Sequence, residues 1–189
     1  MRAVTIDQRR RILAAVPVAL AASGGFEGLA VERIIALAGV SRRTFYELFD
    51  DRADVIRSAY DETFACLYET AMAAAAACER WPDRVTAALR SALGLAASQP
   101  KAASMVAFEP LCANLALRRH HLRSLDRFTP LLREGRREIS GGSELPATLE
   151  PALLGAVCHS VGVRLHRGAA DSLPALAPGL TELLLAPYR

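Results

Sequence analysis

Apolar residues recur at helical spacing through most of this chain, and the pattern changes where glycine or proline interrupts it. The clearest case is the stretch 31–49, VERIIALAGVSRRTFYELF, which predicts two short helices joined by a tight turn. Gly39 would supply the left-handed residue that ends the first helix, and Ser41 would cap the second. This is the sequence form of a helix-turn-helix, whose second helix can enter the DNA major groove. The apolar faces of the two helices would be formed by Val31, Ile34, Ile35, Ala38, Phe45, Leu48 and Phe49.

The same periodicity predicts helices along the rest of the chain. A first helix is expected over 5–22, with Pro17 inside it, where the missing amide should kink the helix or remove one hydrogen bond. Asp51 should cap a long helix that reaches about Cys78, before the break at Trp81-Pro82. No strand pattern is present, so the predicted fold class is all-α with about nine helices. The remaining helices are expected over 83–97, 101–118 with an interruption near Glu109-Pro110, 119–139, 148–167 and 174–186.

Composition limits the compartment and the class of protein. The chain has 189 residues, of which 52% are hydrophobic, and alanine and leucine dominate over β-branched runs, which favours helices. No apolar run reaches the roughly 18 residues of a membrane span, and the start MRAVTIDQRRR has no apolar secretory region, so a cytoplasmic location is expected. The cysteines form no CxxC pair, and buried apolar roles are expected for Cys66, Cys78, Cys112 and Cys158.

The placement of charge says more than the net charge of +3. Arg42 and Arg43 fall in the first turn of the second helix of the 31–49 stretch, where positive charge opposes the helix dipole. A nearby polyanion would explain them. Arg43 can also pair with Glu47 one turn later. The run 9–11 fits a solvated helix face as well as a phosphate clamp.

These residues resemble a known family. The segment AGVSRRTFYELFDDRADV is similar to the DNA-binding signature of TetR-type transcriptional regulators, and LTELLLAPYR is similar to the ending of many family members. The resemblance implies an N-terminal three-helix helix-turn-helix domain, 1–52, followed by a larger helical ligand-binding and dimerisation domain, 53–189. The matching positions are Gly39, Val40, Ser41, Thr44, Phe45, Tyr46, Phe49 and Arg52.

The resemblance also implies roles for individual residues in DNA binding. Thr44 and Tyr46 would contact the DNA backbone, and Arg52 would hold a phosphate at the start of its helix. Arg42 and Arg43 are the candidates for base edges, because arginine pairs with guanine through two hydrogen bonds. The Ser41 hydroxyl can cap its helix, bind phosphate, or do both. Tyr46 could instead pack against the first helix. Two departures from the family pattern are Leu48, at a common DNA-contact position, and Ala30, at a usual hydroxyl cap.

A single helix-turn-helix covers few base pairs, so a homodimer is expected, with recognition helices roughly 34 Å apart on a pseudo-palindromic site. The last two predicted helices carry apolar stripes that could form a four-helix interface. The alternative is that one stripe closes the core of the chain itself. The stripes are formed by Leu149, Leu153, Val157, Val161 and Leu165 and by Leu176, Leu180, Leu183 and Leu184.

By the same resemblance, the central helices over about 55–139 would bind a small apolar effector that lowers the affinity for double-stranded DNA. The expected function is therefore a repressor released from its operator by that effector, without a cofactor or a membrane partner. The candidates for lining a cavity are Phe64, Leu67, Tyr68, Met72, Met105, Phe108 and Leu111, with Glu109, Asn114, His120 or His121 as polar anchors.

Two other classes of protein are weighed against this interpretation. A helical-bundle enzyme would need a motif such as Glu-x-x-His, GxSxG or a phosphate-binding glycine loop, and none is present. His159 and His166, beside Cys158, give only a weak metal signal, so no catalytic or metal residue is assigned. A nonspecific architectural DNA-binding protein would neutralise many phosphates, which the modest net charge argues against.

Overall fold

The computed structural model describes residues 2–107 and 115–189 of the chain. Within these ranges every regular element is a helix and no strand occurs, which confirms the all-α fold class. Several residues named above lie outside the described residues, namely Phe108, Glu109, Pro110, Leu111, Cys112 and Asn114.

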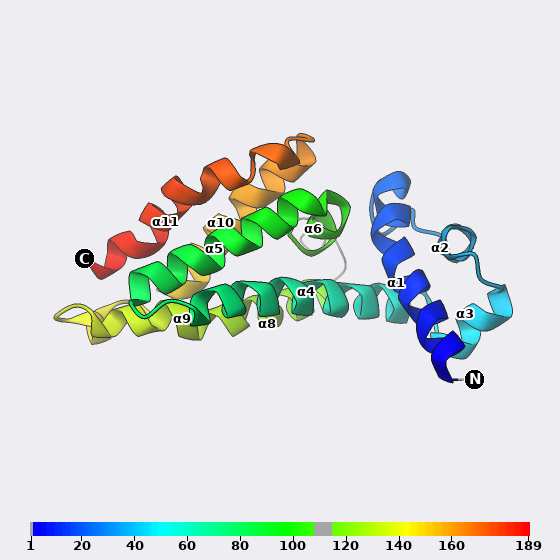
Figure 1. Ribbon diagram of the computed structural model, residues 1–189, viewed down its shortest axis with the longest axis horizontal. Helices are drawn as coiled ribbons and strands as arrows, with labels where there is room; N and C mark the ends of the chain where they lie inside the picture. Colours follow the sequence, from blue (N-terminus) through cyan, green and yellow to red (C-terminus); the bar gives the residue numbers. More distant parts are fainter. Residues whose placement is uncertain (1, 108–114) are drawn as a thin grey trace.

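Three N-terminal helices form a compact unit at one end of the molecule (Figure 1). They are α1 (Arg2–Ser23), α2 (Val31–Ala38) and α3 (Arg42–Leu48). Their apolar faces meet in a core that also takes in the first half of the next helix, as expected for amphipathic helices that must bury one face. Fully buried members of this N-terminal core are Ile12, Val16, Ala19, Ile34, Phe45, Val55 and Tyr60.

The long helix α4 (Arg52–Ala76) leaves this unit and runs along the molecule for about 37 Å. Its predicted cap is confirmed, because the Asp54 amide donates to the Asp51 carboxylate at 2.8 Å. Val55 and Phe64 are buried in the N-terminal core, whereas Ala75, near the other end, is buried in a second core. The helix therefore connects the two cores rigidly.

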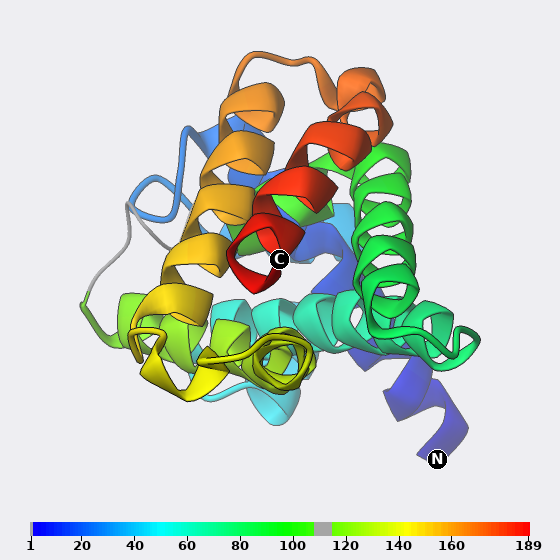
Figure 2. The same ribbon diagram turned by 90° about the vertical axis from the view of Figure 1, so that its left-hand side faces the viewer.

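The second core lies between α4 and a layer of C-terminal helices. Helix α5 (Trp81–Ser98) packs along α4. Helices α10 (Leu149–His166) and α11 (Ala177–Leu185) form the next layer, and α11 packs against α5 (Figure 2). The bundle is completed by α6 (Pro100–Ala107), α8 (Leu115–Leu125) and α9 (Thr129–Arg133). None of the helices in 2–107 and 115–189 is both long and apolar enough to cross a membrane.

The prediction of one helix over 119–139 is wrong. Helix α8 ends at Leu125 and is followed by a 3₁₀ turn, by the short α9, and by a second 3₁₀ turn that ends at Arg137. Pro130 is one reason, because it has no amide to continue the hydrogen-bond ladder. The break directs Leu131 and Leu132 into the second core. Pro17, in contrast, lies inside a continuous α1, and Cys66, which was expected to be buried, is exposed on α4.

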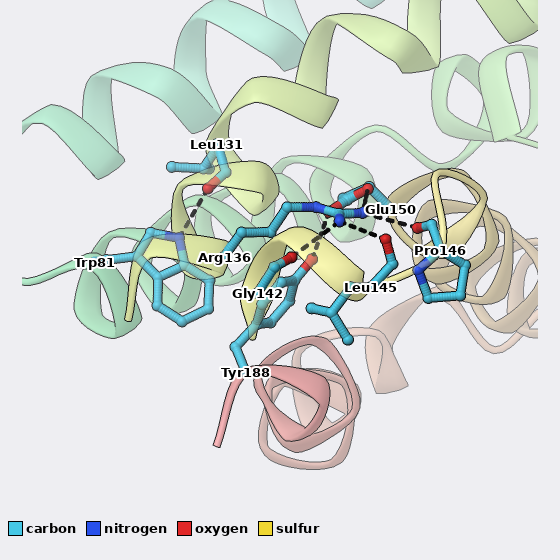
Figure 3. A network of polar contacts seen from close by, with 8 residues as sticks. All are labelled: Trp81, Leu131, Arg136, Gly142, Leu145, Pro146, Glu150 and Tyr188. Carbon is cyan, nitrogen blue, oxygen red and sulfur yellow. Dashed lines mark hydrogen bonds and ion pairs between the residues drawn. The ribbon is translucent and has the colours of Figure 1, made fainter. Parts of the chain in front are cut away.

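A buried ion pair holds the end of the bundle that is remote from the N-terminal unit (Figure 3). The Arg136 guanidinium donates to both carboxylate oxygens of Glu150, at 2.6 and 2.9 Å, and to the carbonyls of Gly142, Leu145 and Pro146. The Glu150 carboxylate is fully buried and also accepts from the Tyr188 hydroxyl at 3.1 Å. The hydrogen bonds from Arg136 lower the pKa of Glu150, so this carboxylate is ionised. The network ties α10 to the preceding turn and to the C-terminus.

Candidate functional site

The turn between α2 and α3 has the predicted backbone. Gly39 is left-handed, with φ 61° and ψ 43°, and its position after α2 ends that helix. Ser41 is extended, and its hydroxyl accepts from the Thr44 amide at 3.0 Å, which caps α3. Ala30 precedes α2 without any side-chain cap. Leu48 is partly buried and packs against the N-terminal core.

Helix α3 presents a basic and aromatic surface. Arg42, Arg43 and Tyr46 are exposed, whereas Phe45 of the same helix is fully buried. The Tyr46 side chain is 47% exposed and touches Phe45 edge-on, which does not support its burial against α1. The Arg42 guanidinium lies 5.6 Å from the centre of the Tyr46 ring, so the two side chains orient each other.

Each of these arginines has a carboxylate partner. The Arg42 guanidinium donates to Glu32 of α2 at 2.7 Å, and the Arg43 Nε donates to Glu47 at 2.8 Å, as the i,i+4 spacing predicts. Both pairs are exposed, and such pairs contribute about 0–1 kcal/mol. The arginines can therefore exchange these carboxylates for another anion at small cost.

Arg52 has a different set of partners. Its guanidinium donates to the carbonyls of Glu27 and Leu29, at 3.2 and 3.0 Å, and so fastens the loop before α2 to the start of α4. Arg33 makes a similar bond to the Ala22 carbonyl. Sequence reasoning missed both contacts, because a guanidinium that meets a carbonyl 11 to 25 residues away leaves no local pattern.

A cavity of about 630 Å³ lies between the N-terminal unit and the helical bundle. Its volume is within the roughly 300–1,000 Å³ of small-molecule sites. The walls come from helices α1, α4, α5, α6, α8, α9, α10 and α11 and from the 3₁₀ turn between α8 and α9. Most of the lining side chains are apolar. Representative lining residues are Leu13, Pro17, Phe64, Leu67, Leu89, Leu93, Val106, Phe128, Val157 and Val161.

Only some of the residues that were predicted to line a cavity do so in the structure. Phe64 and Leu67 line the cavity, but Tyr68, Met72 and Met105 do not. Tyr68 packs against Phe128 and the Arg127 guanidinium, and both methionines pack in the cores. The small residues of α5 and α6 that leave the space open were missed, because an alanine gives no sign of facing a void until its helix is packed. The lining alanines of these two helices are Ala88, Ala92, Ala96, Ala102, Ala103 and Ala107.

His120 and His121 do not line the cavity either. They join α8 to α4: the His121 Nδ1 lies 2.9 Å from the Tyr60 hydroxyl, and the His120 Nε2 lies 2.5 Å from the Asp61 carboxylate. Burial, with a smaller effect of His120, lowers the pKa of His121 from 6.5 to about 4. His121 is therefore neutral near pH 7.

This buried histidine predicts a loss of stability in mild acid. Because the unfolded chain binds a proton below pH 6.5 and the folded chain only near pH 4, the stabilisation is complete above pH 6.5 and falls between pH 6.5 and 4, by up to about 3 kcal/mol. Urea denaturation at a series of pH values will measure it. His121→Gln should flatten the profile in this window, and an unchanged slope in that variant would assign the pH dependence to other groups.

The predicted dimer residues need a correction. Leu153, Val161, Leu180 and Leu184 pack in the second core of the chain itself and keep less than a tenth of their surface exposed, so they offer little surface to a partner. These four residues fit the alternative interpretation of the sequence, in which an apolar stripe packs in the core of its own chain. Helical periodicity alone could not distinguish the two, because either neighbour covers an apolar face. The predicted positions that retain exposed surface are Leu149, Val157, Leu165, Leu176 and Leu183.

A capped helix-turn-helix with an exposed basic second helix, carried on a helical bundle with an apolar cavity, is the architecture of a class of DNA-binding transcriptional regulators. Residues 14–59 match the family model of the bacterial regulatory proteins of the tetR family. The N-terminal helices are therefore similar to the DNA-binding domain of this family.

Solved structures share the fold over nearly the whole chain. The fatty acid degradation regulator FadR from Bacillus halodurans is 21% identical, with a TM-score of 0.83 and 94% of each chain covered. FadR from Bacillus subtilis, in complex with stearoyl-CoA, is 22% identical, with a TM-score of 0.78 over 94% of this chain and 97% of that one. A TetR family regulator from Marinobacter aquaeolei is 12% identical, with a TM-score of 0.74 and coverages of 97% and 98%. A search of curated proteins gave no significant match.

Proposed function

We propose that the chain binds a pseudo-palindromic operator as a homodimer and releases it when a long apolar effector enters the cavity. The observation that carries this proposal is the wall of the cavity, which combines Leu13 and Pro17 of α1 with Leu93 of α5 and Val161 of α10. An occupant would touch the N-terminal unit and the bundle at once. It would then favour one of their relative positions, as effector coupling requires. This regulator would act in the cytoplasm, where its DNA partner lies.

In this proposal, the division near residue 52 separates DNA binding, 1–52, from effector binding and dimerisation, 53–189. Ser41, Thr44 and Tyr46 would contact phosphates, and Arg42 and Arg43 would leave their carboxylate partners to reach base edges. We further propose that α10 and α11 of two copies form a four-helix interface. Leu183, which is 40% exposed, and the open surface at Gly155 support this face.

Selection of bound sequences from random double-stranded DNA will test operator binding. The purified full-length chain should enrich one inverted repeat with half-sites about one helical turn apart. Size-exclusion chromatography with light scattering should give twice the mass of the 20.3 kDa chain. Enrichment of unrelated sequences would contradict specific operator recognition, whereas a single half-site with a monomeric mass would contradict the dimer alone.

Arg43→Ala should weaken binding to the selected operator by about 1–3 kcal/mol, with the loss confined to one base position in each half-site. The reason is that the Arg43 side chain is 88% exposed and can reach a groove as soon as it leaves Glu47. Fluorescence anisotropy with operators substituted at single positions will measure the loss. Arg90→Ala, at an exposed position on α5, is the matched control. A uniform loss over all sequences would assign Arg43 to a phosphate.

The effector is proposed to contain a long acyl chain. Most side chains that line the cavity are apolar, and a structurally similar regulator, FadR from Bacillus subtilis, is seen in complex with stearoyl-CoA. Each added methylene should raise the affinity about fourfold, from about 0.8 kcal/mol of buried surface, until the cavity is filled. Calorimetry with acyl ligands of increasing length will test this. A ligand that binds without changing operator affinity would overturn the proposed regulation.

A further inference from the structure

The cavity opens to solvent where its lining residues are exposed, and these places include a part flanked by α1, α4 and α6. Three charged residues line the cavity at exposed positions, Arg10 of α1, Glu62 of α4 and Lys101 of α6. Gln99, two positions before Lys101 in the sequence, is a polar lining residue that is also exposed. These residues place charged and polar groups from α1, α4 and α6 at the opening, beside the exposed apolar lining residues Ala14 and Val18.

The charges at this opening are not balanced. Glu62 faces Arg9 at 3.9 Å, and Arg10 contacts Asp7 of its own helix at 3.3 Å. Lys101, the only lysine of the chain, forms no hydrogen bond or ion pair with the described residues. It also lies in the first turn of α6, where a positive charge is opposed by the helix dipole. Helix stability therefore does not account for a cation at this position, whereas an anion bound at the opening would.

We infer that the opening binds the anionic head group of an amphiphile, between Arg10 and Lys101, while the apolar chain fills the cavity. This inference rests on the proposed effector function and specifies the chemistry of the ligand. Carboxylate and phosphate share the required charge. Glu62 does not reverse the preference, because Arg9 neutralises it and the opening keeps a net positive charge.

The same geometry explains how occupancy reaches the recognition helix. Arg10 belongs to α1, which packs directly against α2, whereas Lys101 belongs to the helical bundle. A head group held by both would join the N-terminal unit to the bundle through the ligand itself. Pro17, which also lines the cavity, deprives α1 of one backbone hydrogen bond at this level and makes the helix easier to deform. The ligand would thus set the orientation of α3 through α1.

The test compares ligands that share one chain and differ in head group: hexadecanoate, hexadecanoyl-CoA, hexadecanol and hexadecylamine, all below their micelle concentrations. Calorimetry on the full-length chain should give at least one anionic ligand a Kd about tenfold lower than that of hexadecanol. A preference for hexadecanoyl-CoA would identify phosphate as the head group, and one for hexadecanoate would identify carboxylate. Equal binding of hexadecanol, or tighter binding of hexadecylamine, would overturn the inference.

Variants locate the head group. Lys101→Met should weaken binding of the anionic ligand about tenfold and leave the affinity for hexadecanol unchanged. Lys101→Arg should restore the affinity for the anionic ligand. The control Arg90→Met should bind both ligands like the parent chain. Arg10→Met should also reduce the ligand-induced loss of operator affinity. An equal loss for charged and neutral ligands in Lys101→Met would contradict the head-group contact. If hexadecanol alone binds and releases the operator, only this inference fails; if no ligand affects the operator, the proposed function fails.

Discussion

Replacing Arg136 by methionine is expected to destabilise the folded chain by about 3–5 kcal/mol. The variant would leave the Glu150 carboxylate fully buried with only the Tyr188 hydroxyl as a partner, and would free the carbonyls of Gly142, Leu145 and Pro146. Urea denaturation, followed by circular dichroism, will measure the free energy of unfolding. The fluorescence of Trp81, the only tryptophan, will report the same end of the bundle, because its indole donates to the Leu131 carbonyl beside this network.

Two variants separate the buried charge from a general effect of losing an arginine. Arg137→Met, at the exposed neighbouring position, should change stability by less than about 0.5 kcal/mol. Arg136→Met combined with Glu150→Met should be more stable than Arg136→Met alone, because no charge is left buried without a partner. If the double variant is no better than the single one, the carboxylate is not the origin of the loss.

The second large effect is expected at Phe45. Phe45→Ala should cost about 3–5 kcal/mol, because the ring is fully buried in the N-terminal core and contacts both Tyr46 and Phe49. Without the ring, α3 would no longer be packed against the N-terminal core, so operator binding should be lost. The cavity should still take up an acyl ligand, since most of its wall belongs to the bundle. Operator binding by anisotropy and ligand binding by calorimetry will be compared on the same preparation.

Tyr46→Ala is the matched variant, because Tyr46 lies next in the same helix but is exposed. It should weaken operator binding while stability stays within about 0.5 kcal/mol of the parent chain. Phe45→Ala with unchanged operator affinity would mean that α3 is held by contacts other than this ring. A Tyr46→Ala variant that unfolds like Phe45→Ala would show that the tyrosine is structural.

Helix α4 links these two regions of the molecule. It starts at the Asp51 cap in the N-terminal unit, contributes Phe64 to the wall of the cavity, and ends against α5 in the second core. Its contact with α8 through Tyr60 and His121 is buried and hydrogen-bonded. Because one rigid element takes part in both cores, the proposed ligand would change the position of the helix-turn-helix if it moved α1 relative to α4.

Much of the helix-turn-helix could be predicted because its signals are local. The left-handed Gly39, the Ser41 cap, the Asp51 cap and the Arg43–Glu47 pair each depend on residues within five positions of one another. Such contacts form within one turn of a helix or at its end, so residue type and spacing determine them. The prediction failed in 119–139, where Pro130 and the packing of Leu131 and Leu132 break a continuous helical pattern.

The sequence by itself determined the all-α class, the helix-turn-helix and the basic face of its second helix, since helical periodicity and caps are short-range properties. Only the tertiary structure decided that Arg52 fastens the loop before α2, that Leu153 and Leu184 face the chain's own core, and that Arg136 meets a buried Glu150. The tertiary structure also formed the cavity, which brings Arg10 and Lys101, separated by 90 intervening positions in the sequence, into one lining. These features depend on which helices pack together and how closely, and apolar patterning is the same whichever neighbour covers it.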